Sequence, residues 1–154
     1  MPSSTHSENR TRCLQTAIRL LSMREHSRQE LSQKLHQKQL IEGVDVVALL
    51  DQLELADYLS DLRFAEMFVR SRIQKGQGPQ KIRYELAQRG VNQALISETM
   101  QNADVDWLLL AQQQREKRFG LLLPKTYQEQ ARQSRFLAGR GFFSDTIKMT
   151  FNRQ

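Results

Sequence analysis

The stretch from Lys75 to Lys81, KGQGPQK, places two glycines and a proline between lysines, a composition that can bind phosphate. Phosphate-binding loops of this kind follow a strand and open a helix, whose N-terminus holds the anion. Here the residues before the loop have helical periodicity. Gly76 then suits the left-handed end of one helix, and Pro79 suits the first turn of the next. The spacing predicts a turn between helices and no nucleotide pocket, with Lys75 still free to contact a phosphate.

Histidines and carboxylates are the next candidates for chemistry, but neither group forms a set. The histidines lack Cys, His or carboxylate partners at metal-ligand spacing: they are His6, His26 and His36. Asp57, Asp61 and Glu66 resemble a catalytic pair only in spacing, since Asp61 follows a good helix N-cap, where the helix dipole favours an acid. No Ser-His-Asp or Cys-His arrangement has local support. We therefore expect neither an enzyme nor a metal or cofactor site.

The elements that carry these residues are predicted to be helices. Apolar residues recur at three- and four-residue spacing, β-branched runs are few, and the chain has only three prolines. Ser27 and Glu30 form a capping box, in which each side chain satisfies a free backbone donor of the first helical turn. Ser60 is a second N-cap, flanked by Leu59 and Phe64 at the positions of a hydrophobic staple. The fold class predicted from these signals is all-α.

A repeat of 51 residues divides the chain. The anchors of the repeat have equal spacing (86 − 35 and 137 − 86): Leu35, Leu86 and Leu137. Two further sets share that offset: Leu40, Val91 and Phe142, and Lys38, Arg89 and Arg140. One position departs, because Leu31 and Ile82 correspond to Gln133, so the third copy is either divergent or out of register. The repeat predicts three tandem three-helix modules that contact only their neighbours and form an elongated, solenoid-like monomer.

The expected boundaries are a disordered N-terminal tail at residues 1–11 and modules at 12–56, 57–104 and 105–154. The polar tail MPSSTHSENRTR lacks the apolar core of a signal peptide. The apolar runs are far shorter than the roughly 20 residues that span a bilayer. We therefore expect a cytoplasmic protein with no membrane segment.

Charge is concentrated at the C-terminal end. The net charge is +6, and residues 105–154 hold nine basic and four acidic residues, a balance of +5. This distribution indicates an anionic partner. Basic residues on the second helix of module three recur in part at the matching positions of module two, which is either a solvated helix face or a binding surface. The candidate binding residues are Arg70, Arg72, Lys75, Lys81, Arg83, Arg89, Arg132, Arg135 and Arg140.

Three blocks of this sequence resemble the RecX family of bacterial regulatory proteins, over nearly the whole chain from about Thr11: SRQELSQKL, YLSDLRFAEMFVRSRIQKGQGPQKIRYELAQRGV and RFLAGRGF. The resemblance implies a curved, elongated protein of three tandem three-helix repeats. It also implies an inhibitor of the RecA recombinase that lies in the groove of the RecA filament. There it represses ATP hydrolysis and strand exchange and limits filament extension, with roles in DNA repair, DNA recombination and the SOS response.

The expected partners are the RecA filament, single-stranded DNA and, more weakly, duplex DNA. Two alternatives stay open at this point. A helix-turn-helix regulator would also be small, basic and helical, but it would bind a two-fold operator as a dimer. A helical protein that binds single-stranded or duplex DNA by charge and stacking would need no recombinase partner. Whether the basic face meets the recombinase or DNA phosphates is likewise left open by the sequence.

Overall fold

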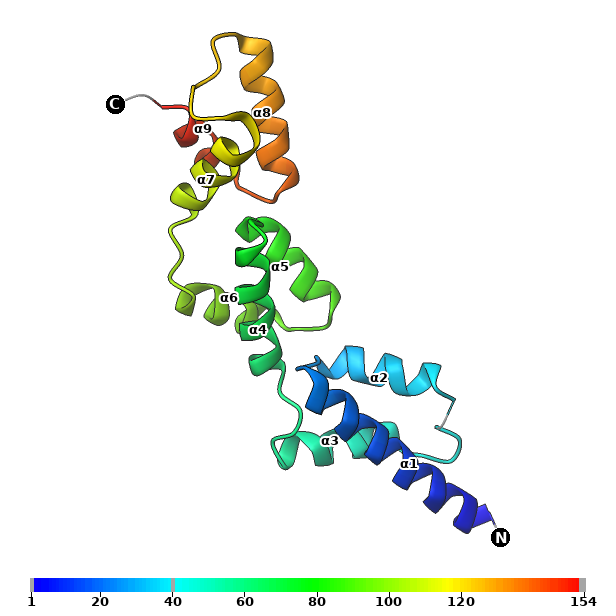
Figure 1. The fold of residues 1–154 in the computed structure, drawn as a ribbon. Helices are drawn as coiled ribbons and strands as arrows, with labels where there is room; N and C mark the ends of the chain where they lie inside the picture. The colour runs from blue at the N-terminus through cyan, green and yellow to red at the C-terminus, as the bar shows by residue number, and fades with distance from the viewer. Residues whose placement is uncertain (1, 40, 153–154) are drawn as a thin grey trace.

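The structure is a computed structural model that describes residues 2–39 and 41–152 (Figure 1). Within these residues the chain forms nine helices and no strand, which confirms the all-α prediction. The helices are α1 (Pro2–Met23), α2 (Arg28–Gln37), α3 (Val46–Leu55), α4 (Asp61–Gln74), α5 (Pro79–Gln88), α6 (Gln93–Asn102), α7 (Trp107–Phe119), α8 (Tyr127–Gly139) and α9 (Ser144–Thr150).

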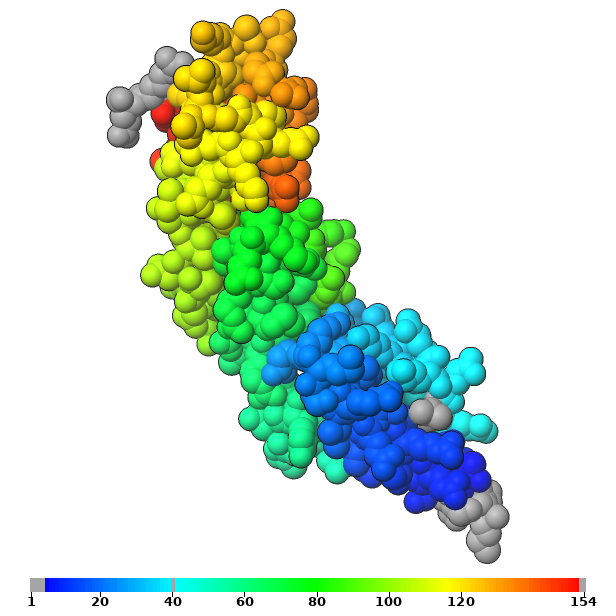
Figure 2. All heavy atoms as spheres, viewed as in Figure 1, coloured from blue at the N-terminus to red at the C-terminus, as the bar shows by residue number. Residues whose placement is uncertain are grey.

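Three helix triplets follow one another end to end: α1–α3, α4–α6 and α7–α9, which we call modules one, two and three (Figure 1). The extensive helix-to-helix contacts all lie within a triplet. The space-filling view shows the result, an elongated and gently curved molecule with the two ends of the chain far apart (Figure 2). This arrangement confirms the predicted tandem repeat of three-helix units.

Each module has its own hydrophobic core, and the repeat anchors lie in these cores. Their side chains are at most 1 % exposed: Leu35, Leu86 and Leu137. Val91 and Phe142 are buried at matching positions, while Leu40, the third member of that set, lies outside the described residues. Small separate cores are typical of repeat proteins, in which a module is stabilised by its own packing and by its neighbours.

Gln133 shows that the third repeat is divergent and in register. It is 3 % exposed, at the position where Leu31 and Ile82 are fully buried. Its Oε1 accepts a hydrogen bond of 3.2 Å from the guanidinium of Arg115, which is itself 2 % exposed. Arg115 also donates to the carbonyl oxygens of Leu121 and Leu122, each at 3.3 Å. A polar network therefore occupies the position that a buried aliphatic side chain holds in the other two modules. Its hydrogen bonds offset the cost of burying these polar groups.

The predicted helix ends are present. Ser27 and Glu30 form the expected capping box, and the Ser60 hydroxyl accepts from the amide of Arg63. Gly76 has φ +81°, beyond the C-cap of α4, and Pro79 is the first residue of α5. The sequence GQGP is therefore an inter-helix turn, as predicted. The repeat also appears in the backbone, where positive φ recurs at its offset (90 − 39 and 141 − 90): Gln39, Gly90 and Gly141.

The N-terminal tail expected to be disordered at residues 1–11 is instead helical from Pro2 onward, as the first half of α1. Tertiary contacts explain the difference. The Asn9 amide donates to the carbonyl oxygen of Glu42 at 3.1 Å, and Arg10 donates to the Gln52 side chain. The His6 ring lies against Gly43, in the loop before α3. The polar start of α1 has no apolar pattern of its own. Contacts with α3 and with the loop before it hold this segment in place.

Candidate nucleic-acid interface

The modules are joined through the ends of their second helices. The Ser27 hydroxyl, at the N-terminus of α2, donates to the carbonyl oxygen of Arg89 at the C-terminus of α5, at 2.7 Å. The Gly78 amide, at the N-terminus of α5, donates to the carbonyl oxygen of Arg140 after α8, also at 2.7 Å. Both pairs are related by the repeat offset (78 − 27 and 140 − 89). The same head-to-tail joint is therefore built twice, and each satisfies carbonyl groups that a helix C-terminus leaves free.

The joint between modules one and two is reinforced by charged side chains. The Asp61 carboxylate accepts from the backbone amide of Arg28 at 2.8 Å, and burial raises the pKa of this carboxyl despite that bond. Arg63 of module two pairs with Glu25 of module one at 2.9 Å. These acids hold one module to the next. The sequence predicted that Asp61 acts locally, in the first turn of its own helix, and its bond to Arg28 adds a contact between modules.

A hollow of about 220 Å³ lies beside this first joint, lined by Arg24, Glu30, Phe64, Met67, Phe68, Ser71, Arg72, Lys75 and Arg89. The guanidiniums of Arg72 and Arg89 lie over the Phe68 ring, 4.5 and 4.7 Å from its centroid. Carboxylates pair with these cations. Glu30 is 3.4 Å from Arg24 and 3.8 Å from Arg89, and Glu85 is 3.2 Å from Arg72.

An equivalent hollow of about 260 Å³ lies beside the second joint, lined by Lys75, Gln114, Lys117, Arg118, Phe136 and Arg140. Arg118 and Arg140 lie over the Phe136 ring, 5.6 and 5.2 Å from its centroid. Phe136 also packs edge-on against Phe119 at 5.4 Å. In the part of the chain that the structure describes, no carboxylate lies within ion-pair distance of the four cations that line this hollow.

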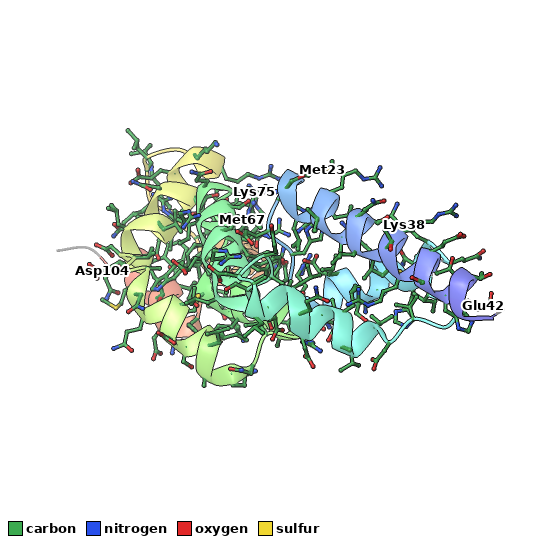
Figure 3. The ribbon with its side chains drawn as sticks, turned by 90° about the horizontal axis from the view of Figure 1, so that it is seen from below. Met23, Lys38, Glu42, Met67, Lys75 and Asp104 are labelled. Carbon is green, nitrogen blue, oxygen red and sulfur yellow. The ribbon has the colours of Figure 1, made fainter. Side chains whose placement is uncertain are left out.

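Lys75 lines both hollows, so the cations form one continuous series along a side of the molecule. We call this series the basic row: Arg24, Arg72, Lys75, Arg89, Lys117, Arg118 and Arg140. In a view along the length of the molecule, Lys75 and the α1 end at Met23 lie toward the same side (Figure 3). A row of cations of this length attracts anions and raises their local concentration.

Four of the nine residues predicted from the sequence lie in the basic row: Arg72, Lys75, Arg89 and Arg140. Arg132 adjoins the row, because its guanidinium lies 5.0 Å from the centroid of the Phe119 ring, and it pairs with Glu129 at 3.2 Å. Lys81 lies at the second joint, where its stem packs directly against Gly141.

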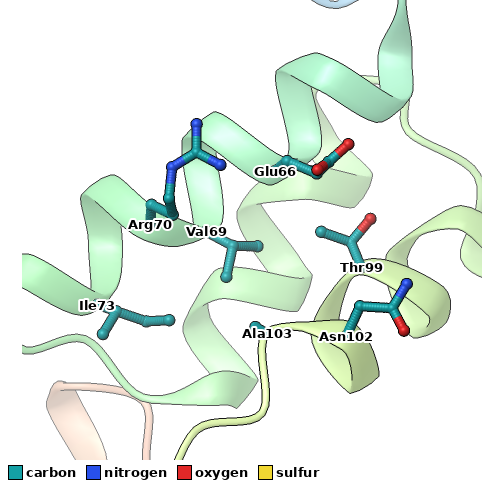
Figure 4. A pocket seen from close by; sticks show the side chains of 7 residues that line it. All are labelled: Glu66, Val69, Arg70, Ile73, Thr99, Asn102 and Ala103. Atoms are coloured by element: carbon teal, nitrogen blue, oxygen red, sulfur yellow. The ribbon is translucent and has the colours of Figure 1, made fainter.

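The other three predicted residues lie away from both the row and the second joint. Arg70 borders a pocket of about 260 Å³ between α4 and α6, with Glu66 and Asn102 around an apolar floor (Figure 4). Arg83 borders another hollow together with Trp107 and Phe143. Arg135 is exposed on α8, with no contact to the row. Residues two apart on a helix point about 200° apart, which is why Arg70 and Arg72 lie on different sides.

Sequence reasoning missed three members of the row: Arg24, Lys117 and Arg118. Arg24 precedes Lys75 by the repeat offset (75 − 24), so the repeat contained this signal. Arg118 corresponds to Arg72 only if the first helices are aligned on their N-caps, Ser60 and Asp106, which differ by 46 residues. The shorter offset arises because the loop between α7 and α8 is longer than the loop between α4 and α5, and because α8 is itself longer than α5.

Other chemistry finds no support in the described residues. No group of three or more His, Cys, Asp or Glu side chains there could hold a metal ion. The thiol of Cys13 is buried, which raises its pKa. None of the helices described is both long enough and apolar enough to cross a bilayer.

Comparisons with known proteins agree with this architecture. Family models for the first, second and third three-helix domains of RecX match residues 13–42, 60–100 and 104–151. The regulatory protein RecX of Halorhodospira halophila is 46 % identical over 132 residues, which cover 86 % of this chain and 81 % of the relative. The RecX protein of Cronobacter sakazakii is 36 % identical over 150 residues, which cover 92 % and 91 % of the two chains.

Solved structures show the same fold. The crystal structure of RecX from Lactobacillus salivarius superposes with a TM-score of 0.77 at 20 % identity, covering 94 % of this chain and 95 % of that one. A second crystal structure of a regulatory protein RecX gives a TM-score of 0.80 at 21 % identity, covering 94 % of this chain and 73 % of that one. The family models, the curated relatives and the tandem three-helix fold together show that this chain belongs to the RecX family of regulatory proteins.

Proposed function

We propose that this protein binds the RecA nucleoprotein filament and inhibits the ATPase and strand-exchange activities of the recombinase. It thereby regulates DNA repair and recombination, including the SOS response. It acts in the cytoplasm as a monomer and without enzymatic activity of its own. Membership of the RecX family supports this proposal, because the curated relatives are named regulatory proteins and not enzymes.

The basic row is the observation that carries the proposal. A filament on single-stranded DNA presents phosphates and acidic side chains repeatedly along its axis. An elongated molecule with cations at both module joints can meet several such groups at once, so that weak individual contacts add up to useful affinity. The row supplies seven cations on one side of the molecule.

A titration into RecA filaments tests the proposal. ATP hydrolysis on single-stranded DNA is followed as the parent protein is added, beside a variant with Lys75→Ala, Lys117→Ala and Arg118→Ala. We expect the variant to need about tenfold more protein for half inhibition, equivalent to about 1.4 kcal/mol. The matched control removes three predicted arginines that lie away from the row: Arg70→Ala, Arg83→Ala and Arg135→Ala. A parent protein that does not inhibit would overturn the function, and equal weakening by both variants would overturn the role of the row.

A DNA-binding protein without a recombinase partner is the second candidate. The cations around Phe119 and Phe136 favour it, since proteins that bind single strands combine cationic grooves with aromatic side chains. A DNA-only arm of the titration separates the two candidates. If RecA on the oligonucleotide leaves the affinity of the parent protein unchanged, the second candidate is favoured.

A further inference from the structure

The two module joints have the same architecture but differ in net charge. The two acids that pair with cations of the first hollow are replaced at the second joint, at the repeat offset (81 − 30 and 136 − 85): Glu30 by Lys81, and Glu85 by Phe136. Ser71 of the first hollow corresponds to Lys117 of the second when the first helices are aligned on their N-caps. The first joint therefore has carboxylates that neutralise part of its positive charge. The second joint has a cation and an aromatic ring at the matching positions.

The second hollow has a higher net positive charge than the first. The first has four lining cations and two carboxylates paired with them, a net charge of about +2. The second has four lining cations and no paired carboxylate among the described residues, a net charge of about +4. The second hollow therefore carries about two more positive charges than the first.

The cations of the second hollow are also held in position by neighbouring groups. Arg118 and Arg140 flank one ring, which limits their motion, and Arg140 donates to the carbonyl oxygen of Lys75 at 3.4 Å. Lys75 belongs to module two, whereas Lys117 and Arg118 extend from the last turn of α7 in module three. Guanidinium and ammonium groups that converge from separate helices, without a carboxylate, match a phosphodiester group.

We propose that the hollow between modules two and three binds the phosphate backbone of single-stranded DNA, and that the equivalent hollow between modules one and two does not. This inference assigns a DNA-binding site within the proposed function. It rests on that function only where it takes the bound DNA to be the strand inside a RecA filament. The first joint then serves mainly to hold modules together. The second joint supplies the electrostatic contact with DNA.

The test is the salt dependence of binding to a fluorescent oligo(dT), which measures the number of phosphates neutralised. A variant with Lys117→Gln and Arg118→Gln should bind more weakly, and the magnitude of its negative log–log salt slope should fall by about 1.4, since each single-strand contact contributes about 0.7. The control variant, Arg12→Gln with Arg19→Gln, loses the same charge from exposed positions of α1. It should leave the slope unchanged. Circular dichroism is used to check that both variants retain the helical content of the parent protein.

A gain of binding gives the converse test. Glu30→Gln together with Glu85→Gln removes both acids that pair with the cations of the first hollow, and glutamine retains the capping role at position 30. If the proposal is right, the freed cations bind one or two further phosphates and the magnitude of the salt slope increases by about 0.7 to 1.4. No rise in slope, or an equal fall for the two charge-loss variants, overturns the proposal.

Filament assays keep this inference distinct from the proposed function. If the Lys117→Gln, Arg118→Gln variant inhibits RecA less well while its affinity for bare oligo(dT) and its salt slope are unchanged, the hollow meets acidic side chains of the recombinase. That outcome overturns the phosphate site and leaves the function standing. If the parent protein fails to inhibit RecA but the salt slopes behave as expected, the function fails and the phosphate site stands.

Discussion

The hydroxyl of Ser27 lies 2.7 Å from the carbonyl oxygen of Arg89, although the two residues are 62 positions apart in the chain. The same hydroxyl accepts a hydrogen bond from the amide of Glu30 at 3.1 Å. One side chain thus caps the start of α2 and also joins module one to the end of α5. The joint between modules is an extension of helix capping.

Ser27→Ala should therefore destabilise the protein more than loss of a cap alone. Loss of an N-cap costs about 1 kcal/mol, and loss of the bond to Arg89 adds about 0.5 to 1.5 kcal/mol. Ser60→Ala is the matched control, because Ser60 caps α4 through the amide of Arg63. Urea denaturation measures both free energies of unfolding. Equal costs for the two variants would show that the bond across the joint contributes no stability.

Gly78→Ala should disrupt the second joint through close contact and not through backbone strain. Its φ is −85°, but a Cβ there would lie 2.5 Å from the backbone carbonyl of Gly141. Overpacking of this kind costs about 1 to 3 kcal/mol. Gly139→Ala provides the contrast, since a Cβ at Gly139 in the last turn of α8 meets nothing within 4 Å. It should be neutral or stabilise by up to about 1 kcal/mol. Thermal unfolding of both variants checks the difference, and a harmless Gly78→Ala would contradict the joint.

His26 should make stability depend on pH. The ring is 1 % exposed, its Nδ1 lies 3.0 Å from the carbonyl oxygen of Arg24, and its Nε2 lies 2.8 Å from the ammonium of Lys34. A neutral ring fits this geometry, donating from Nδ1 and accepting at Nε2. Burial is the main cause that lowers the pKa of His26 from its ordinary value, and the nearby charges of Arg24 and Lys34 act in the same direction.

The unfolded chain then binds a proton more readily than the folded one. The free energy of unfolding should be at its full value above pH about 6.5 and should fall below it, by at most about 1.4 kcal/mol per pH unit. Urea denaturation between pH 5 and pH 8 measures this slope. His26→Gln removes the titrating group while keeping polar atoms in place. If this variant retains the slope of the parent below pH 6.5, His26 is not its source.

Arg115 and Gln133 should be energetically coupled. Gln133→Leu restores the apolar residue of the other repeats but leaves the buried guanidinium without one acceptor, at a cost of about 1 to 3 kcal/mol. The double variant Arg115→Met, Gln133→Leu removes both partners. It should be less destabilised than the sum of the two single variants by about 1 kcal/mol or more. A double-mutant cycle by urea denaturation measures the coupling, and strict additivity would contradict the network.

The chain should be an elongated monomer in solution. A compact globule of 154 residues has a radius of gyration of about 15 Å. Three modules joined end to end should exceed that value clearly (Figure 2). Small-angle scattering after size-exclusion chromatography measures both mass and shape. A radius near 15 Å at the monomer mass, or a dimer mass, would contradict the expectation.

Local signals in the sequence were sufficient to predict the helices, the tandem repeat and the turn at GQGP. These features depend on local chemistry: the capping box at Ser27, the proline that opens α5 and the glycine that ends α4 act within a few residues of themselves. The repeat placed Leu35, Leu86 and Leu137 in separate cores because each core is formed within one short segment. Local signals of this kind do not depend on how the modules are arranged in space.

Which cations share a side of the molecule could not be predicted from local signals, because it depends on how the modules are rotated relative to one another. The rotation between modules is set by the joints at Ser27 and Gly78, and no local pattern encodes that rotation. It brings Arg118 to the same hollow as Lys75 and leaves Arg70 beside α6. The tertiary structure also sets which cations are neutralised, because a carboxylate offsets the charge of a cation only when the two lie within ion-pair distance. The helical start of α1 likewise depends on contacts with the loop before α3 and with α3 itself, which lie more than 30 residues away along the chain.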